Sequence, residues 1–178
     1  MQIRPAHTND AAGLARVHVD SWRVAYKGIV PDEHLASLSY DKRADRWRES
    51  LSNADSASFV YVAQDDDGTI IGFASGGRER DGDPNYLGEL YVIYLHPDYL
   101  RRGIGRRLAQ TVARRLIDMG LTSMIVWVLA QNPSRQFYEA LGGKYLYEKT
   151  IEIGRVSLID VAYGWPDIHT LAQMETAS

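Results

Sequence analysis

The segment between residues 89 and 119 has the composition best suited to binding an anion: an apolar run, then glycines and arginines, then an amphipathic stretch. Backbone N–H groups at a helix N-terminus have no partner within the helix, and the helix dipole is positive there. Glycine lets the backbone approach an anion and adopt a positive φ, and successive free N–H groups form an anion cradle. We therefore predict a phosphate or pyrophosphate site in this loop, which contains Gly103 and Gly105, at the start of the following helix.

The sequence gives little support to the other functions that glycine-containing motifs can indicate. No segment matches the P-loop pattern. A dinucleotide fingerprint needs a third glycine, and this chain has Leu108 at that position. Residues 72–76 are similar to the nucleophile elbow of serine hydrolases. However, Ser75 comes one place late and the segment follows a hairpin, which argues against a serine hydrolase.

The spacing of apolar residues predicts the elements that position the glycine loop. Helices are predicted at 10–26, 34–38, 41–51, 104–119 and 133–141, and strands at 2–4, 59–63, 69–75, 89–95, 124–129, 145–153 and 156–163. Residues 76–88 are predicted to be a solvated loop, and residues 165–178 a polar, frayed tail. This order predicts one domain over residues 1–178. Its fold class is mixed α/β, with six or seven strands and helices on both faces of the sheet.

Composition excludes several classes of function. The chain has 178 residues, of which 45% are apolar and 24% charged, and its net charge of −3 argues against a nucleic-acid partner. It has no cysteine, which rules out disulfides and a thiol-borne acyl-enzyme. The longest apolar run, residues 124–130, is far shorter than the ~20 residues of a membrane helix. We expect a cytoplasmic protein with no membrane partner. The spacing of its five histidines predicts no metal site.

Two motifs place the glycine loop within a longer sequence pattern. The first is Gly-x-Gly at Gly103 and Gly105, after a His-Pro pair that ends the strand. The second is Asn-x-x-x-x-Phe-Tyr-x-x-x-Gly over residues 132–142. Over roughly residues 57–147 the chain resembles the acyl-CoA-binding core of the GNAT superfamily of N-acetyltransferases. It departs from the family pattern at Leu100, where Gln or Arg is usual, which affects a side-chain contact but leaves the backbone cradle intact.

The resemblance implies a GNAT-like bent sheet with acetyl-CoA as co-substrate. In that family two central parallel strands splay apart, and the pantetheine arm lies in the gap and pairs with the backbone. Carried over to this chain, the backbone contacts fall on Ile93, Tyr94 and Leu95, and the pyrophosphate contacts on residues 101–106. Asn132 is then expected to meet the coenzyme arm.

The resemblance also suggests residues that move protons. Tyr138 is expected near the thioester sulfur, where it protonates the leaving thiolate. An alkyl amine with a pKa near 10.4 is almost fully protonated at pH 7, so transfer also needs a base. Glu89, at the start of the central strand, is the predicted base. Trp22 and Tyr26 are predicted to contact the acceptor, because the first helices wall that site in relatives, although both residues also suit core packing.

Three functions compete on these observations. The first is direct transfer of an acetyl group from acetyl-CoA to a primary amine on a small molecule or peptide. The second is an acyl-CoA sensor that has lost catalysis, which an intact Tyr138 and Glu89 oppose. The third is nucleic-acid binding through the arginines of residues 101–115, which a pI near 5.9 opposes. The sequence leaves the acceptor and the oligomeric state open, a homodimer included.

Overall fold

The computed structural model describes residues 1–53 and 57–174, and these contain a single seven-stranded sheet of order β1-β2-β3-β4-β5-β7-β6. All neighbouring strands are antiparallel except β4 and β5. The strands are β1 (Gln2–Pro5), β2 (Ser58–Gln64), β3 (Ile70–Arg78), β4 (Gly88–Leu95), β5 (Met124–Leu129), β6 (Lys144–Ile153) and β7 (Val156–Trp165). The α-helices are α1 (Ala11–Ala25), α2 (Asp32–Ala36), α3 (Tyr40–Ser52), α4 (Ile104–Asp118), α5 (Arg135–Ala140) and α6 (His169–Gln173). Short 3-10 turns are η1 (Thr8–Asp10) and η2 (Pro97–Tyr99).

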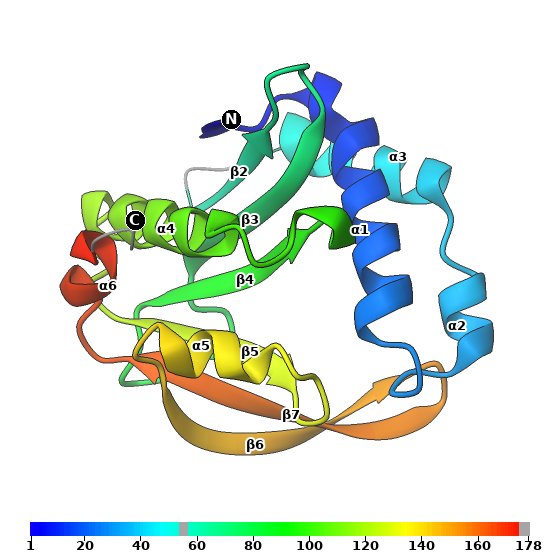
Figure 1. Cartoon of the computed structure of the whole chain (residues 1–178). Coiled ribbons are helices and arrows are strands. Elements are labelled where there is room, and N and C mark those ends of the chain that lie inside the picture. Colours follow the sequence, from blue (N-terminus) through cyan, green and yellow to red (C-terminus); the bar gives the residue numbers. More distant parts are fainter. Residues whose placement is uncertain (54–56, 175–178) are drawn as a thin grey trace.

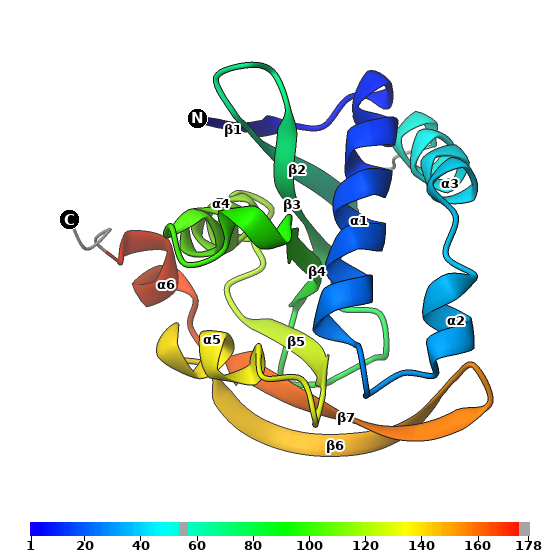
Figure 2. The ribbon, with the colours of Figure 1, turned by 45° about the vertical axis from the view of Figure 1, so that its right-hand side comes forward.

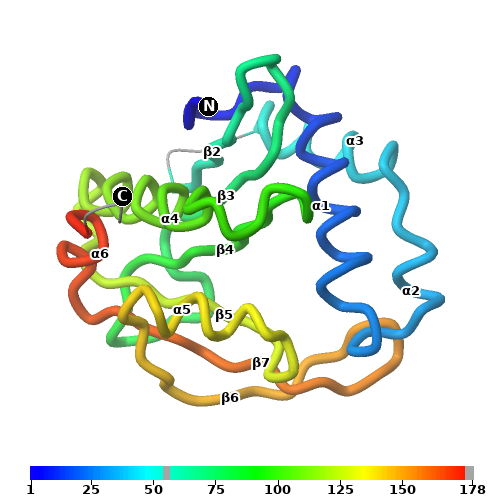
Figure 3. The backbone as a smooth tube through the Cα atoms, in the orientation of Figure 1, coloured from blue at the N-terminus to red at the C-terminus, as the bar shows by residue number. Residues whose placement is uncertain are grey.

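Helices cover both faces of the sheet, as predicted (Figure 1). On one face α4 packs on β2, β3 and β4 and carries α6 on its outer side; on the other, α1 packs on β3 and β4 and contacts α3. Leu108, Val112 and Leu116 of α4 repeat every four residues and are fully buried. Leu14 and Val17 of α1 are likewise fully buried, in a separate apolar cluster. The tube view shows these two helices on either side of β3 and β4 (Figure 3).

The parallel pair at the centre of the sheet splays apart. β4 and β5 pair only from Gly88↔Met124 to Leu90↔Val126. Both strands then continue without pairing with each other, and the ribbons diverge (Figure 2). A register shift in the β3–β4 ladder leaves Tyr91 as an extra residue, a bulge that bends β4. The predicted splayed parallel pair is therefore confirmed.

The hairpin of β6 and β7 extends past the open end of the gap. Its two-residue turn, Gly154-Arg155, has positive φ at both positions (57° and 70°), which is the geometry of a type I′ hairpin turn. The register set by this turn places Lys149 opposite Asp160, and Asp160 in turn opposite Leu129 at the end of β5. A carboxylate on β7 thus lies where β5 has already separated from β4.

Two sequence predictions are wrong in detail. The expected loop at residues 76–88 begins only after Arg78, because Gly76 and Gly77 continue the β3 ladder. A side chain at Gly77 would clash, since an added Cβ would lie 2.2 Å from the carbonyl oxygen of Ala57. Glycine, which weakens most strands, is here the residue that lets two strands approach.

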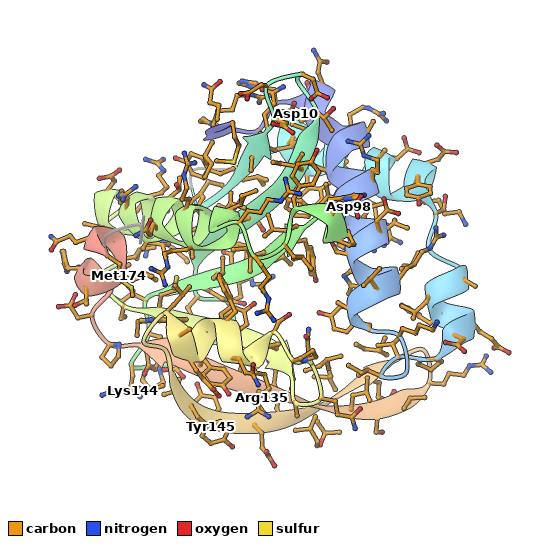
Figure 4. All side chains as sticks on the ribbon, in the orientation of Figure 1. Asp10, Asp98, Arg135, Lys144, Tyr145 and Met174 are labelled. Atoms are coloured by element: carbon orange, nitrogen blue, oxygen red, sulfur yellow. The ribbon has the colours of Figure 1, made fainter. Side chains whose placement is uncertain are left out.

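The predicted frayed tail after Trp165 is also incorrect up to Met174, the last described residue, which Figure 4 labels. Ile168 and Leu171 have exposed fractions of 0% and 1% and join the main apolar core. The Arg114 guanidinium of α4 donates to a carbonyl of α6 at 3.1 Å. The composition of this segment is polar, but Ile168, Leu171 and Ala172 are buried in the main core beside residues of α4. None of the described helices is long and apolar enough to cross a membrane.

Candidate active site

The loop that enters α4 has the backbone geometry of an anion cradle. Gly103 is the N-cap of α4 with φ 74° and ψ −4°, and no atom lies within 4 Å of a Cβ built on it. Arg101, two residues earlier, also has a positive φ of 62°. The first N–H groups of the helix have no intrahelical acceptor. The left-handed backbone at 103 therefore favours glycine, and the N–H groups that follow it are available to an anion.

Gly105, the other glycine of the motif, serves a different purpose. A Cβ at this position would lie 3.2 Å from the ring of Phe137 and 3.5 Å from a methyl group of Leu95. Gly105 is buried, as is its neighbour Ile104. The absence of a side chain lets the start of α4 approach both α5 and the end of β4. Gly103 therefore shapes the loop, whereas Gly105 allows close packing behind it.

The predicted arginines surround the loop with positive charge. Arg101 and Arg102 are exposed, and Arg106 is half-buried. The Arg102 guanidinium donates to the carbonyl oxygen of Asp98 at 2.9 Å and lies 5.0 Å from the centre of the Tyr99 ring. Figure 4 labels Asp98 beside the end of β4. These contacts fold Arg102 back onto η2, while Arg101 projects from a left-handed backbone.

The last three residues of β4 line the gap. Ile93, Tyr94 and Leu95 pair with β3 on one side, and β5 has separated from them on the other. Ser21 of α1 donates its hydroxyl to the carbonyl oxygen of Leu95 at 2.7 Å, and Trp22 donates its indole N–H to the Tyr94 hydroxyl at 3.0 Å. The end of β4 is therefore held by β3 and α1, and its other edge faces the gap.

Polar groups from three elements meet where the gap opens. The Tyr26 hydroxyl, at the end of α1, hydrogen-bonds with the side chains of Tyr94 and Asn132. Asn132 is buried, and its Oδ1 accepts from the backbone N–H of Ser134 at 2.9 Å, just before α5. Trp22 packs on Tyr26 with ring centres 4.6 Å apart. The structure thus brings the predicted residues Trp22, Tyr26, Tyr94 and Asn132 into one network.

Tyr138 is buried on α5 next to this network. Its ring packs against Phe137 and Tyr163, with centres 5.3 and 6.2 Å away. Burial, and then the nearby Tyr26 and Asp160, raise the pKa of its hydroxyl. The hydroxyl therefore stays protonated at neutral pH, as a proton donor must be.

The start of α5 is fixed by Arg135, which Figure 4 labels. Its guanidinium donates to the carbonyl oxygen of Ala130 at 2.9 Å and to the Tyr163 hydroxyl at 3.0 Å. The Tyr163 hydroxyl in turn donates to Glu139 at 2.6 Å. These bonds tie both ends of the short helix to β7 and to the end of β5, which restricts where the Tyr138 ring can lie.

Glu89 is buried at the start of β4, with an exposed fraction of 3%, and it is bound on both carboxylate oxygens. The Arg80 guanidinium donates to Oε1 at 2.5 Å and to Oε2 at 3.0 Å, and the backbone N–H of Arg80 donates to Oε2 at 3.3 Å. Arg80 also lies over the ring of Tyr91, 3.9 Å from its centre. The predicted base is therefore engaged in a bidentate ion pair.

Glu89 forms part of the wall of a cavity of about 450 Å³. Its lining comes from the β3–β4 connection and from four strands: Arg80, Asp81, Glu89, Tyr91, Trp127, Lys149, Ile151 and Asp160. The sequence analysis singled out Glu89 but missed Asp160. A signal was present, because Asp160 is the one charged residue in the same-face row Leu158, Asp160, Ala162 of β7, whose other members are buried.

Comparisons with known proteins agree with this architecture. The sequence model of the acetyltransferase (GNAT) family matches residues 15–143. The uncharacterised N-acetyltransferase YuaI of Bacillus subtilis is 43% identical over 169 residues, 95% of each chain. PaiA N-acetyltransferase of Thermoplasma acidophilum, solved with coenzyme A, has a TM-score of 0.65 at 24% identity, over 90% of this chain and 96% of its own. YncA of Salmonella typhimurium, solved with acetyl-CoA, has a TM-score of 0.67 at 20% identity, over 100% of this chain and 97% of its own. With a splayed parallel pair, a left-handed glycine before α4 and these matches, the chain belongs to the GNAT family of acetyltransferases.

Proposed function

We propose that this protein transfers an acetyl group from acetyl-CoA to the nitrogen of a primary amine. The observation that carries the proposal is the gap between β4 and β5, which pair over three residue pairs and then separate next to the glycine loop. A cavity walled by β4 to β7 adjoins it, with Tyr138 close by. The relative YuaI, which is similar along nearly its whole length, is named as an N-acetyltransferase.

The residues present suit acetyl-CoA as the co-substrate, which supplies the activated acetyl group. The open N–H groups around Gly103 and the flanking Arg101, Arg102 and Arg106 suit a pyrophosphate. The backbone edge at Ile93, Tyr94 and Leu95 suits an amide-containing arm, which would add like a strand to β4. Asn132 lies beside this edge through its bond with Tyr26. Ile104 and Gly105 hold the cradle in place from within the core.

Tyr138 is the proposed proton donor to the leaving thiolate. Its raised pKa keeps the hydroxyl neutral, and the bonds of Arg135 and Glu139 fix the helix that carries it. General acid catalysis of this kind is typically worth ~10²–10⁴-fold in rate. The proposed transfer is direct, and the chain has no cysteine that could form a thiol-borne acyl-enzyme.

Glu89 is the base that the sequence predicts, and the structure attaches a condition to that role. Arg80 occupies both of its carboxylate oxygens. Together with the backbone N–H of Arg80, three donors bind this carboxylate and leave it little further capacity to accept a proton. Glu89 therefore remains a residue of the cavity wall, which its pairing with Arg80 fixes.

An assay of coenzyme thiol release tests the proposal against the alternative of an acyl-CoA sensor. Acetyl-CoA is offered with a panel of primary amines of different size and charge, and acetylated products are identified by mass. The proposal predicts thiol release that depends on the amine, with one acetyl group added per thiol released. Tight coenzyme binding by calorimetry, with no acetylation of any amine, would favour the sensor.

A further inference from the structure

The charges that line the cavity are paired, with one exception. Arg80 is bound to Glu89, and the Lys149 ammonium is bound to Asp81 at 2.6 Å. The Asp160 carboxylate has no hydrogen bond or ion pair with any of the residues that the structure describes. The lining holds two cations and three carboxylates, so one negative charge is left over, and it belongs to Asp160.

Lys149, the cation nearest to Asp160 in the sheet, is paired with a different carboxylate. Lys149 lies directly opposite Asp160 in the β6–β7 ladder. Its ammonium nevertheless bonds to Asp81 and lies 3.8 Å from the centre of the Trp127 ring. Cross-strand partners of opposite charge ordinarily pair. In this hairpin the register places Lys149 opposite Asp160, but the Lys149 ammonium bonds to Asp81. The Asp160 carboxylate is therefore left open to the cavity.

Asp160 sits in an environment that penalises its charge. It lies between Leu158 and Ala162 in the same-face row of β7, and both neighbours are buried. Burial raises the pKa of Asp160 to about 6, and the Lys149 ammonium opposes this shift. A half-buried carboxylate without a partner costs free energy. Because the Asp160 carboxylate does not stabilise the fold, a functional role is the better explanation for its presence at this position.

Asp160 is also close to the proposed proton donor. It acts on the hydroxyls of Tyr138 and Tyr26, raising the pKa of each. A group bound at Asp160 from the cavity therefore lies near the part of the gap where Tyr138 stands. Glu89 lies in the same cavity, but both of its carboxylate oxygens are bound to Arg80.

We propose that the cavity is the acceptor site, that Asp160 binds the ammonium group of the acceptor and removes its proton, and that the acceptor is a primary alkylamine without a carboxylate. The inference rests on the proposed N-acetyl transfer and names the residue and the substrate class that the transfer would use. A carboxylate on the acceptor would have no free cation to meet, because Arg80 and Lys149 are both paired. Arg80 and Lys149 each cover one face of the Tyr91 and Trp127 rings. The remaining surface of these rings and of Ile151 in the lining suits an apolar or aromatic body on the amine.

The proton and electron balance of this step closes within the two substrates and two side chains. The Asp160 carboxylate takes one proton from the ammonium group. The freed nitrogen lone pair forms a bond to the carbonyl carbon of the acetyl group, the second nitrogen proton leaves to solvent, and the carbon–sulfur bond breaks. Tyr138 gives its proton to the departing sulfur. Water then carries a proton from the Asp160 carboxyl toward the Tyr138 oxygen, which restores both groups.

Charged and titratable groups face Asp160 from each element around it. Lys149 comes from β6, Arg80 and Asp81 from the β3–β4 segment, and Glu89 from β4. On the side of the gap, the charge of Asp160 acts on the hydroxyls of Tyr26, just after α1, and Tyr138 of α5. The two cations are neutralised by Asp81 and Glu89. Asp160 is therefore the group in this cavity expected to set a limb near pH 6 in kcat/KM.

Asp160→Asn is the test variant and Glu152→Gln its matched control. Glu152 is an exposed carboxylate on β6 of the same hairpin, outside the cavity, so both variants remove one negative charge from the hairpin. The probes are phenethylamine and phenylalanine, which share the ring and the spacing to nitrogen and differ in the carboxylate. We expect Asp160→Asn to lower kcat/KM for phenethylamine by at least about tenfold and to abolish the limb near pH 6. Glu152→Gln should keep both.

The melting temperature of Asp160→Asn distinguishes a functional role of Asp160 from a structural one. A carboxyl whose pKa is higher in the folded than in the unfolded state destabilises the fold once the pH rises through the folded value. At pH 7.5 Asp160→Asn should therefore melt at the same temperature as the parent or higher, and coenzyme A should bind it normally. A structural residue would instead lower the melting temperature together with the activity.

The remaining outcomes are distinct. Wild-type protein should prefer phenethylamine to phenylalanine by at least about tenfold, since a second carboxylate would face Asp160. Preference for phenylalanine would overturn the acceptor class. Acetylation of amines with an unchanged pH limb in Asp160→Asn would overturn the role of Asp160 and leave the proposed function standing. Coenzyme binding without acetylation of any amine would overturn the proposed function.

Carboxyl NMR of the coenzyme-bound protein gives a readout without turnover, because the Asp160 signal should titrate near pH 6 and shift when phenethylamine is added.

Discussion

The two sides of the β4–β5 gap are built in opposite ways. The coenzyme side comes from one continuous stretch, in which β4, a left-handed glycine turn and α4 follow one another within about thirty residues. The cavity side is assembled from separate parts of the chain: the β3–β4 segment, β4, β5, β6 and β7. A local stretch carries its chemistry in its own sequence. A composite cavity acquires its chemistry only when the strand register brings distant side chains together.

The difference indicates which side selects the acceptor. Backbone N–H groups at a helix terminus bind any pyrophosphate, whatever the neighbouring side chains are. The cavity recognises its ligand through side chains such as Asp160 and Trp127, each of which can change without disturbing the loop. We therefore expect changes on the coenzyme side to affect every acceptor equally. Changes on the cavity side should discriminate between acceptors.

The largest expected effect is on the coenzyme side, from Gly103→Val. Gly103 has φ 74°, a conformation that costs a β-branched residue on the order of 1–3 kcal/mol. Relaxing this strain would turn the cradle N–H groups away, so we expect coenzyme A affinity by calorimetry to fall about a hundredfold.

Gly120→Val is the matched control for this change. Gly120 has φ 77°, also with open space at its Cβ position, but it lies at the other end of α4. It should share the strain and keep the affinity. Normal coenzyme binding by Gly103→Val would place the cradle elsewhere.

Tyr138→Phe comes next and acts between the two sides. It removes the hydroxyl and keeps the ring that packs on Phe137 and Tyr163. We expect kcat to fall at least about tenfold, most strongly for poorly reactive amines, with little change in coenzyme affinity. Tyr145→Phe, at an exposed tyrosine labelled in Figure 4, is the control and should have no effect. An unchanged kcat in Tyr138→Phe would leave a mechanism in which the enzyme only aligns the reactants.

Glu89→Gln separates the two carboxylates of the cavity, Glu89 and Asp160. Because Arg80 holds both carboxylate oxygens, we expect the loss in kcat/KM to stay below about tenfold, under the usual range for a general base. The limb near pH 6 should remain. If that limb disappears and activity recovers at high pH, where the amine loses its proton unaided, Glu89 is the base and the role proposed for Asp160 is wrong.

The smallest effect concerns His18, which lies behind the gap in a cage formed by Trp22, Trp47, Phe73 and Tyr94. Both of its ring nitrogens are buried without a partner, and burial lowers its pKa to about 3. The unfolded chain takes up a proton near pH 6.5 and the folded chain does not. Stability is therefore lost as the pH falls through that value, by about 1 kcal/mol between pH 7.5 and 6. Urea unfolding of His18→Phe should lack this pH dependence; an equal loss in the variant would assign it to another group.

The fold was largely predictable because its signals are local. Apolar spacing located α1, α3, α4 and β5 to within a residue or two, and the glycine motif located the loop before α4. The errors fall where context overrides composition. Gly76 and Gly77 continue β3 because they allow a close approach of β2, and Ile168 and Leu171 fold a polar segment onto α4.

The candidate site was predictable on one side only. The residues of β4, the loop and α5 stood in recognisable order along the chain. The bond between Arg80 and Glu89 joins residues only nine positions apart, yet nothing in the sequence specifies it. Asp160 faces the cavity because a type I′ turn at Gly154-Arg155 fixes the hairpin register, and a shift of one residue would turn it to the other face.

In the proposed transfer, coenzyme and amine occupy the two sides of the gap at the same time. Initial rates measured while both acetyl-CoA and the amine are varied test this directly. We expect double-reciprocal lines that intersect, because both substrates must be bound before the acetyl group moves, and intact-protein mass spectrometry should find no acetylated enzyme during turnover. Parallel lines, or a trapped acetyl-enzyme, would instead show that the acetyl group passes through the protein, and simultaneous binding would then be wrong.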